Sequence, residues 1–461
     1  MLKQLTVQWY KGFCAKQTFR FAIPDGTHAG SGLTIIVGPN NSGKTTFIES
    51  LAFTIDSNNS HHFSEGARHA RPPVISITTD TGKTRRITNV DGGSQVKLLG
   101  DNVDDQQIEI VSSRRHWEAQ YSGDMDFTSF SHQSSRLVRN AGDPGTAALL
   151  ARVNRDPAQK AQLTNLMKKL VPDFTTWTVD TRDQGGDYIR YETGRGRFHA
   201  VDMLGDGIIS LFRICLHLVN VDTDALTLVI DEPELSLHPS AQKMLRQVLS
   251  SASAKKQIII ITHSPLLVDW NDISNGACVI RLNKVNDMQC VVSQLNPAGT
   301  YMSRLTRAVK QYQKPELLDS VAKEILFANR VLFLEGKEDV GLLRRWLHSS
   351  GKAIEFEMFG YGVGGHGDMH VYLSLAKDLG ISRVGALFDG STSSYATCKS
   401  DFPEYKVEEL SVDDIRDKFE DVGGVKTQLH TGLFDASGEL KPASLTELEG
   451  LIDDFNAYFS S

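Results

Sequence analysis

The feature that most constrains this chain is a glycine-rich segment, residues 38–46, which reads GPNNSGKTT. The apolar run 33–37 before it predicts a buried strand, and residues 44–53 predict a helix. A strand, a glycine loop and a helix in this order are typical of a loop that binds the phosphates of a nucleoside triphosphate. The segment fits the pattern G-x-x-x-x-G-K-[ST], whose fixed positions are Gly38, Gly43, Lys44 and Thr45.

The side chains of this loop predict how ATP and Mg²⁺ bind. The glycines let backbone N–H groups surround the β-phosphate, and the N-terminus of the helix adds partial positive charge. We expect Lys44 to reach the β- and γ-phosphates and the Thr45 hydroxyl to bind Mg²⁺. The other residues assigned to the nucleotide in this loop are Gly38, Asn40, Asn41, Ser42, Gly43 and Thr46.

Composition excludes several classes of protein. The formal net charge of the 461 residues is -7, which argues against a globally basic nucleic-acid binder and leaves a local patch open. The five cysteines are scattered without a C-x-x-C pair, so we expect neither a zinc site nor a disulfide framework. The N-terminus lacks the pattern of a signal peptide, and no run approaches the ~18 apolar residues that span a bilayer. We therefore expect a cytoplasmic protein without a membrane partner.

Two further apolar runs predict buried strands that end in polar residues. Residues 226–230 precede Asp231 and Glu232, and residues 257–262 precede His263. Buried strands that alternate with helices indicate a parallel sheet in an α/β domain. We expect Asp231 to hold Mg²⁺ through water, Glu232 to polarise the attacking water, and His263 to bond the γ-phosphate.

The remaining patterns predict insertions and a second domain. Residues 74–111 alternate as strands, 145–170 have helical spacing, and 173–198 alternate again as an antiparallel pair. Residues 112–116 either face the ligand or form a solvated basic turn. The predicted organisation is an ATPase domain over 1–310 with β-rich and helical insertions at about 56–200, a linker helix over 311–328, and a smaller α/β domain over 329–461.

Three segments together resemble one family. GPNNSGKTT, LVIDEPELSLHPSAQKML and IITHSPLL are similar to the ABC-type ATPases of the overcoming-lysogenization-defect (OLD) class and their AAA-15 and AAA-21 relatives. The resemblance implies that residues 234–239 are the D-loop and that His263 is the switch histidine. It also implies that Leu204, Gly205, Asp206 and Gly207 form the signature motif, which completes the ATP site of a second protomer. Gly205 stands where the family has serine.

The last part of the chain resembles a Toprim domain, the nuclease module of OLD-type proteins. The strand 330–334 ends in Glu335, and the strand 384–388 ends in Asp389. Carboxylates at the ends of neighbouring parallel strands converge, and such clusters bind Mg²⁺ for phosphodiester chemistry. Toprim nucleases carry Asp-x-Asp where this chain has Asp389-Gly390-Ser391. The carboxylates that could compensate for the missing aspartate are Asp368, Glu409, Asp413 and Asp414.

Two functions remain open, and a third is weaker. The chain is either an ATP-regulated nuclease that cuts DNA or RNA in bacterial anti-phage defence, or an ATPase sensor and scaffold. The missing second aspartate, the glycine at position 205 and the lack of a strongly basic second domain favour the scaffold. The scaffold resembles the ATPase component of the PARIS defence system, which holds a separate Toprim nuclease until a phage protein triggers release. Both imply a homo-oligomer, a dimer or larger, with ATP between protomers. A DNA-repair ATPase of the RecF/SMC type is the third reading, and the lack of a long coiled coil weakens it.

Overall fold

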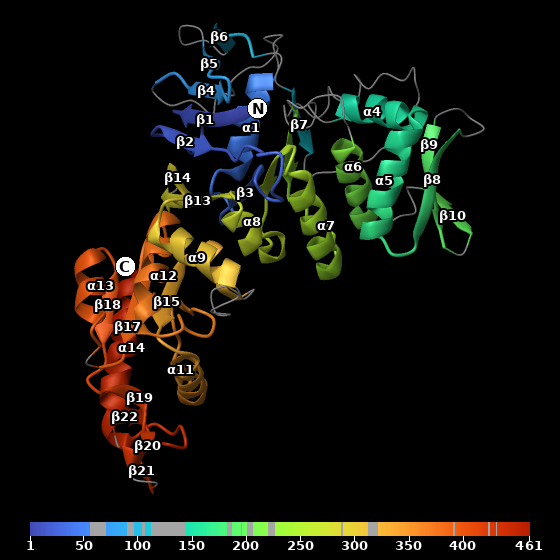
Figure 1. The fold of residues 1–461 in the computed structure, drawn as a ribbon. Coiled ribbons are helices and arrows are strands. Elements are labelled where there is room, and N and C mark those ends of the chain that lie inside the picture. Colours follow the sequence, from blue (N-terminus) through green and yellow to red (C-terminus); the bar gives the residue numbers. More distant parts are fainter. Residues whose placement is uncertain are drawn as a thin grey trace. The chain divides into compact units, whose positions relative to one another are not determined.

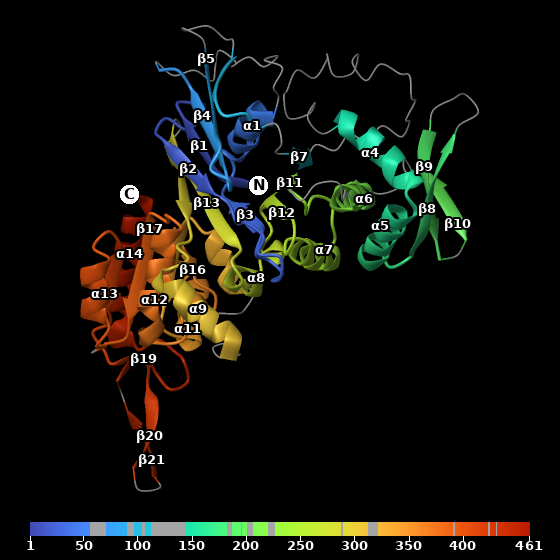
Figure 2. The same cartoon turned by 45° about the horizontal axis from the view of Figure 1, so that its top comes forward.

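The chain divides into two compact units, residues 1–292 and residues 293–461, and each is described by itself. The fold is drawn in Figure 1 and, turned by 45°, in Figure 2. The computed structural model describes residues 1–55, 71–89, 96–103, 107–111, 143–181, 187–194, 196–200, 206–219, 226–286, 289–311, 321–390, 392–422, 425–429 and 431–461.

The first unit is built on a six-stranded sheet with the order β14-β13-β3-β12-β11-β7. From β13 to β7 every neighbouring pair of strands is parallel. All five residues of β3 and of β12 are buried, as expected for strands covered on both faces. The strands are β3 (Leu33–Val37), β7 (Gln107–Val111), β11 (Leu226–Asp231), β12 (Gln257–Ile261), β13 (Cys278–Asn286) and β14 (Gln289–Gln294).

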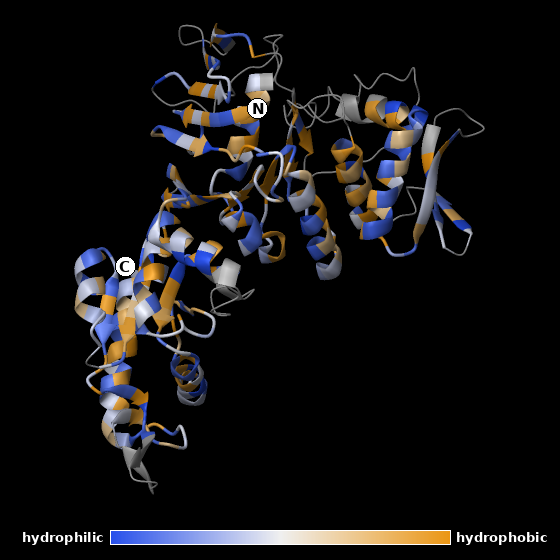
Figure 3. Ribbon diagram, in the orientation of Figure 1, coloured by the Kyte–Doolittle hydropathy of each residue, from blue (hydrophilic) through white to orange (hydrophobic). Residues whose placement is uncertain are grey.

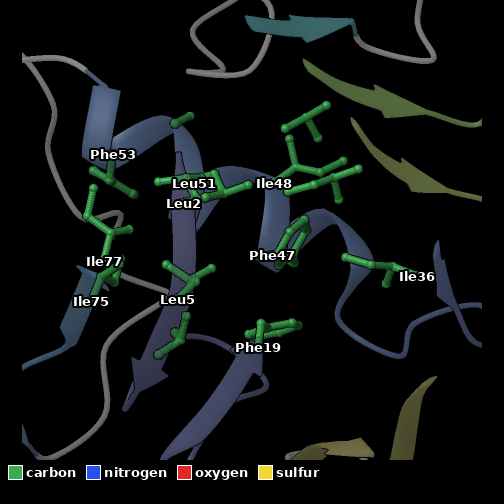
Figure 4. Packing of buried hydrophobic residues seen from close by; sticks show 14 of the residues in the cluster. Leu2, Leu5, Phe19, Ile36, Phe47, Ile48, Leu51, Phe53, Ile75 and Ile77 are labelled. Atoms are coloured by element: carbon green, nitrogen blue, oxygen red, sulfur yellow. The ribbon is translucent and has the colours of Figure 1, made fainter. Parts of the chain in front are cut away.

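A second, antiparallel sheet lies beside helix α1 (Lys44–Ile55). Its strand order is β2-β1-β4-β5-β6. Phe19, Phe47 and Ile36, from β2, α1 and β3, belong to one buried cluster (Figure 4). That cluster fixes α1, and with it the glycine loop before α1, between the two sheets. The strands are β1 (Leu2–Gln8), β2 (Gln17–Arg20), β4 (Val74–Thr79), β5 (Thr84–Asn89) and β6 (Val96–Gly100).

The opposite face of the main sheet carries α7 (Pro239–Ala252) and α8 (Trp270–Ser274), as both ribbon views show. Between them in the sequence is the short helix η3 (Pro265–Leu267), which contacts α7. Helix α6 (Asp206–Leu218) contacts β7, and its residues 210–218 are all buried. Figure 3 accordingly colours most of α6 as hydrophobic.

A lobe of two helices and a three-stranded antiparallel sheet packs on α6. Trp177 is fully buried, and its ring meets that of Phe212 on α6 edge-on at 5.3 Å. These elements confirm the expected helical and β-rich insertions. They are α4 (Asp143–Arg155), α5 (Pro157–Leu170), β8 (Phe174–Thr181), β9 (Asp187–Thr193) and β10 (Arg197–Ala200). Residues 112–116 lie outside the described part of the chain.

The second unit is a smaller α/β structure around a parallel sheet with the order β16-β15-β17-β18. One face packs against α11 and α14, and the other against α12. The strands are β15 (Arg330–Leu334), β16 (Glu357–Met358), β17 (Arg383–Phe388), β18 (Lys406–Glu409), β19 (Asp414–Arg416), β20 (Lys418–Val422), β21 (Val425–Leu429) and β22 (Gly432–Phe434). The helices are α9 (Thr300–Gln311), η4 (Val321–Leu326), α11 (Lys337–Ser350), α12 (His366–Asp378), α13 (Tyr395–Asp401), η5 (Pro442–Ser444) and α14 (Leu445–Ser460).

The division between the units differs from the predicted one, because α9 packs within the second unit. The sequence placed residues up to 310 in the first domain, whereas the structure divides the chain after Val292. Tyr301 of α9 is fully buried against Tyr372 of α12, with ring centroids 6.2 Å apart. The Arg304 guanidinium also pairs with Asp368 at 2.9 Å.

The described helices include none that is long and apolar enough to cross a bilayer.

Candidate functional site

Three polar segments meet at one edge of the main sheet. Parallel pairing sets Asp231 opposite Ile261, and Ile261 opposite Ile36. The strands β3, β12 and β11 therefore end side by side, and the segments that follow them lie together. The backbone amide of Glu232 donates to the Ile261 carbonyl at 2.8 Å, and that of Thr262 donates to the Ile36 carbonyl at 3.0 Å. These bonds extend the sheet into the predicted site.

The glycine loop has the backbone that a phosphate cradle needs. Asn41 has a φ of 61° and Gly43 a φ of 102°, both left-handed, and the segment opens directly into α1. A side chain at Gly38 would meet the Leu282 carbonyl oxygen at 2.5 Å, and one at Gly43 would meet Phe13 at 2.9 Å. Glycine is therefore required at both positions by the packing around the loop.

Lys44 lies at the centre of the site. Its Nζ donates to the carbonyls of Gly38 at 2.9 Å and Pro39 at 2.6 Å. Burial lowers the pKa of Lys44, and the nearby carboxylates of Glu232, Asp231 and Glu234 oppose that shift. The ammonium group therefore lies in the field of the carboxylates that follow β11.

Two features of the protein itself suit the binding of a triphosphate and a metal ion by this loop. The Ser42 hydroxyl oxygen is buried and has no hydrogen-bond partner within the described residues, as expected for a group that phosphate would satisfy. Thr45, in the first turn of α1, is exposed and can present its hydroxyl to a metal ion. Asn40 and Asn41 are exposed and Thr46 is buried.

The carboxylates after β11 are held by an unusual backbone. Glu232 has a φ of 46°, in the left-handed region that non-glycine residues seldom adopt. Strain of this kind occurs at functional sites, where the surrounding structure enforces it. Asp231 and Glu232 are both partly buried. The structure therefore brings Lys44, Asp231 and Glu232 together, as the sequence predicted.

His263 follows β12 at the same edge. Its side chain is exposed, and its pKa is lowered by partial burial and by the Lys44 ammonium, with Glu232 acting in the opposite direction. The neutral imidazole is therefore favoured, which can donate or accept a hydrogen bond. The backbone amide of His263 donates to Oε1 of Glu234 at 2.7 Å. Glu234 belongs to the predicted D-loop, and its contact with His263 was not predicted.

Half of the predicted signature motif lies within the described residues. Asp206 and Gly207 begin α6, whereas Leu204 and Gly205 fall outside the described part. A side chain at Gly207 would meet the Ser236 carbonyl oxygen at 2.4 Å. The start of α6 therefore packs directly against the predicted D-loop of the same chain. The expected contact with a second protomer stays a prediction.

In the second unit, Glu335 and Asp389 follow neighbouring parallel strands, as the sequence predicted. Glu335 is buried, and its Oε1 accepts hydrogen bonds from the Asp389 amide at 3.1 Å and the Thr392 hydroxyl at 3.3 Å. The Glu335 carboxylate thus holds the loop after β17. Ser391 falls outside the described residues.

Asp339, which was not among the predicted site residues, adds a third carboxylate to this edge. Burial raises the pKa of Asp339 to about 6, and the Glu335 and Glu338 carboxylates add to that rise. Burial also raises the pKa of Asp389 to about 7, followed by the effects of Asp339 and Glu335. Because α11 begins at once after β15, a carboxylate four positions after Glu335 returns to the strand end. That spacing was the signal available in the sequence.

The other predicted compensating carboxylates have partners of their own. Asp368 pairs with Arg304, Asp414 pairs with Lys418, and Glu409 accepts from the Thr392 amide at 3.0 Å. Within the described ranges, no group of three or more histidine, cysteine, aspartate or glutamate residues is arranged to hold a metal ion. Among the described residues of the second unit, these carboxylates are therefore not grouped around a common metal position in this conformation. Asp413 also has a partner.

Two models of known protein families match the first unit. A family model described as "AAA domain, putative AbiEii toxin, Type IV TA system" matches residues 88–269. A second model, of an AAA domain, matches residues 4–146. Together with the sheet order and the glycine loop, these matches show a P-loop ATPase domain in the first unit, consistent with the predicted ABC-type fold.

Two curated relatives match part of this chain. One is the OLD nuclease of Thermus scotoductus, 34% identical over 116 residues, which are 24% of this chain and 21% of the relative. The other is endonuclease GajA of Bacillus cereus, 30% identical over 159 residues, which are 34% of this chain and 25% of the relative. The matched segments thus span about a fifth and a quarter of these relatives.

Solved structures that match part of this chain include heads of SMC proteins. The SMC head domain of Thermotoga maritima matches with a TM-score of 0.39 and 15% identity, over 64% of this chain and 99% of its own. The Smc head of Pyrococcus furiosus bound to the C-terminal domain of ScpA matches with a TM-score of 0.45 and 12% identity, over 68% of this chain and 99% of its own.

The family models and the two curated relatives, taken together, identify the chain as an ATPase that is distantly related to OLD nuclease and GajA.

Proposed function

We propose that this chain is the ATP-hydrolysing sensor and scaffold of a bacterial anti-phage defence system. In this role it assembles as a homo-oligomer with ATP between protomers. It holds a separate effector nuclease and releases it when a phage-encoded protein is detected. The distant relationship to OLD nuclease and endonuclease GajA supports a place among ATPases of this type.

The hydrolytic step proposed here depends on residues at the edge of the main sheet. The loop amides and Lys44 bind the phosphates, and Thr45 and Asp231 hold the magnesium ion. When bound, that ion neutralises charge on the phosphate oxygens. Glu232 orients and polarises the attacking water, and His263 bonds the γ-phosphate from the neighbouring strand. The lowered pKa of His263 keeps the imidazole neutral near pH 7.

The observation that carries the scaffold role is the use of the Glu335 carboxylate inside the protein. Its Oε1 binds the Asp389 amide and the Thr392 hydroxyl, and Glu409 binds the Thr392 amide. These carboxylates fasten the loop after β17, and within the described residues they belong to no group of three or more possible metal ligands. Such a unit suits docking of another protein better than phosphodiester cleavage.

An OLD-type nuclease is the second candidate, and one observation favours it. The Glu335 carboxylate lies close enough to Asp339 and Asp389 to raise the pKa of both, and Asp339 adds to the rise at Asp389. A divalent ion that drew them together would be stabilised by all three charges. The two candidates therefore differ in whether the negative charge of Glu335 is needed.

Phage protection by the native locus tests this difference. Glu335→Gln keeps an oxygen that can accept both hydrogen bonds and removes the charge that a metal ion needs. The scaffold role predicts that Glu335→Gln cells remain protected and that Lys44→Ala cells lose protection. Loss of protection in Glu335→Gln, with normal protein level, would contradict the scaffold and support the nuclease.

A further inference from the structure

One carboxylate joins the ends of two strands at the ATP site, and its role is not explained by the reaction itself. Glu234 lies on the loop after β11, three positions beyond Asp231. Its Oε1 accepts a hydrogen bond of 2.7 Å from the backbone amide of His263, which follows β12. The Thr262 side chain also bonds the Glu234 carboxylate. A single side chain thus holds both residues that follow β12.

The loop that carries Glu234 is itself rigidly built. The Leu237 amide donates to the Glu234 carbonyl at 3.0 Å, and the Leu235 amide donates to the Glu232 carbonyl at 3.1 Å. Glu232 and Ser236 both have positive φ, 46° and 62°. Two consecutive turns with left-handed residues therefore set the direction of the Glu234 side chain.

His263 depends on this bond for its position. Its imidazole is exposed and makes no hydrogen bond within the part of the chain that the structure describes. The side chain is therefore positioned by its backbone and not by hydrogen bonds of its own, and Glu234 holds the backbone amide. A change of a few tenths of an ångström at that amide moves the ring relative to Lys44, whose charge already acts on it.

We infer that Glu234 is a positioning residue for ATP hydrolysis: its carboxylate fixes the His263 backbone so that the imidazole meets the γ-phosphate. This inference rests on the ATPase role proposed for His263. Glu234 acts through His263 and does not itself touch the nucleotide. Its Oε2 is buried and has no hydrogen-bond partner among the described residues, so only one oxygen of the pair is needed for this role.

The geometry makes a prediction that separates position from charge. Glu234→Gln retains an oxygen at the Oε1 position and can still accept from His263, whereas Glu234→Ala loses the acceptor. If Glu234 instead acted by its charge on Lys44, the glutamine variant would fail as the alanine variant does. The ratio of ATP turnover in Glu234→Gln to that in Glu234→Ala therefore shows whether Glu234 acts as a hydrogen-bond acceptor or by its charge.

A double-mutant cycle of ATP turnover by the full chain tests the inference. We expect Glu234→Ala to lower kcat about 10- to 100-fold with ATP affinity changed by less than about twofold, because the loss is confined to the transition state. Glu234→Gln should restore kcat to within about threefold of wild type. In a His263→Ala background, adding Glu234→Ala should lower kcat by less than about a further twofold, since the two residues act as one unit.

Controls keep the outcomes distinct. Glu192→Ala removes a carboxylate from β9 and should leave kcat unchanged, and binding of a fluorescent ATP analogue monitors the fold of the site. Wild-type turnover in Glu234→Ala, equal losses in the alanine and glutamine variants, or losses that multiply in the double mutant would each overturn the inference. Wild-type protein without turnover would remove the ATPase assignment itself. Normal turnover in a chain that fails to protect cells would contradict the proposed defence role and would leave the positioning role of Glu234 unaffected.

Discussion

The backbone amide of Asp389 donates a 3.1 Å hydrogen bond to the carboxylate of Glu335. The two residues follow parallel strands β15 and β17, so the bond ties one strand end to the next. A buried carboxylate that accepts a backbone hydrogen bond contributes to stability by satisfying both groups. The same carboxylate would be a metal ligand in a nuclease, so its contacts help to distinguish the nuclease from the scaffold.

The pKa of Asp389 makes the stability of the second unit depend on pH. Burial and the neighbouring Asp339 and Glu335 raise that pKa from 3.8 to about 7. Between these values the folded state binds more protons than the unfolded state, so stability falls as pH rises through the window. We expect Asp389→Asn to flatten this fall and to gain about 1–2 kcal/mol at pH 8 in EDTA.

Urea unfolding followed by tryptophan fluorescence measures this effect, because Trp346 is the sole tryptophan of residues 293–461. Replacing the other tryptophans with phenylalanine isolates its signal. Asp435→Asn is a matched control, since Asp435 is only partly buried and hydrogen bonding by Ser437 lowers its pKa. An unchanged pH slope in Asp389→Asn would contradict the coupling between these carboxylates.

Lys44→Ala should remove ATP turnover. The ammonium lies among the carboxylates of Glu232, Asp231 and Glu234, where it is the cation of the loop that can meet the phosphates. Loss of one such preorganised charge lowers turnover by about 100-fold or more. The exposed Lys243 on α7 provides the control. Phosphate release measures both variants, and retained turnover in Lys44→Ala would refute the assignment of the loop.

Gly207→Ala should disturb the start of α6. A Cβ there would lie 2.4 Å from the Ser236 carbonyl oxygen, which is backbone and cannot move aside alone. We expect a loss of about 1–3 kcal/mol in unfolding free energy, together with slower ATP turnover. Gly450 in α14 has no atom near its Cβ position, so Gly450→Ala should be neutral or stabilising. Equal behaviour of the two variants in thermal unfolding would argue against this packing.

Trp177→Ala should loosen the helical lobe from α6. Trp177 is fully buried against Phe212, and its removal leaves a cavity that costs about 3–5 kcal/mol. Phe198 on β10 is 49% exposed, and Phe198→Ala should cost far less. Hydrogen exchange of the α6 amides reports the effect. Unchanged exchange in Trp177→Ala would show that the lobe contributes little to holding α6.

Much of the ATP site could be predicted because its parts are local motifs joined by one topological rule. Lys44, Asp231 and His263 each follow a recognisable apolar strand, and parallel strands end at one edge. The bond between Glu234 and the His263 amide could not be predicted. It depends on left-handed backbone at Glu232 and Ser236, which sequence patterns do not specify for these residue types.

The fold was less predictable where pairing is distant in sequence. Strands β4 to β6 join the antiparallel sheet, whereas β7, a few residues later, joins the parallel sheet beside β11. Both sets have the same alternating pattern, so periodicity alone does not choose between the two sheets. The amphipathic helix α9 likewise has no local signal for the unit on which it packs, and the burial of Tyr301 on α12 decides it.

Cleavage by the purified chain tests the proposed scaffold role most directly. Plasmid DNA and tRNA would be incubated with the chain in Mg²⁺ or Mn²⁺, with and without ATP, beside Glu335→Gln and Lys44→Ala. The predicted result is ATP turnover without cleavage of either nucleic acid under any condition. Cleavage by the wild type that is lost in Glu335→Gln would contradict it, because the chain would then be its own effector nuclease.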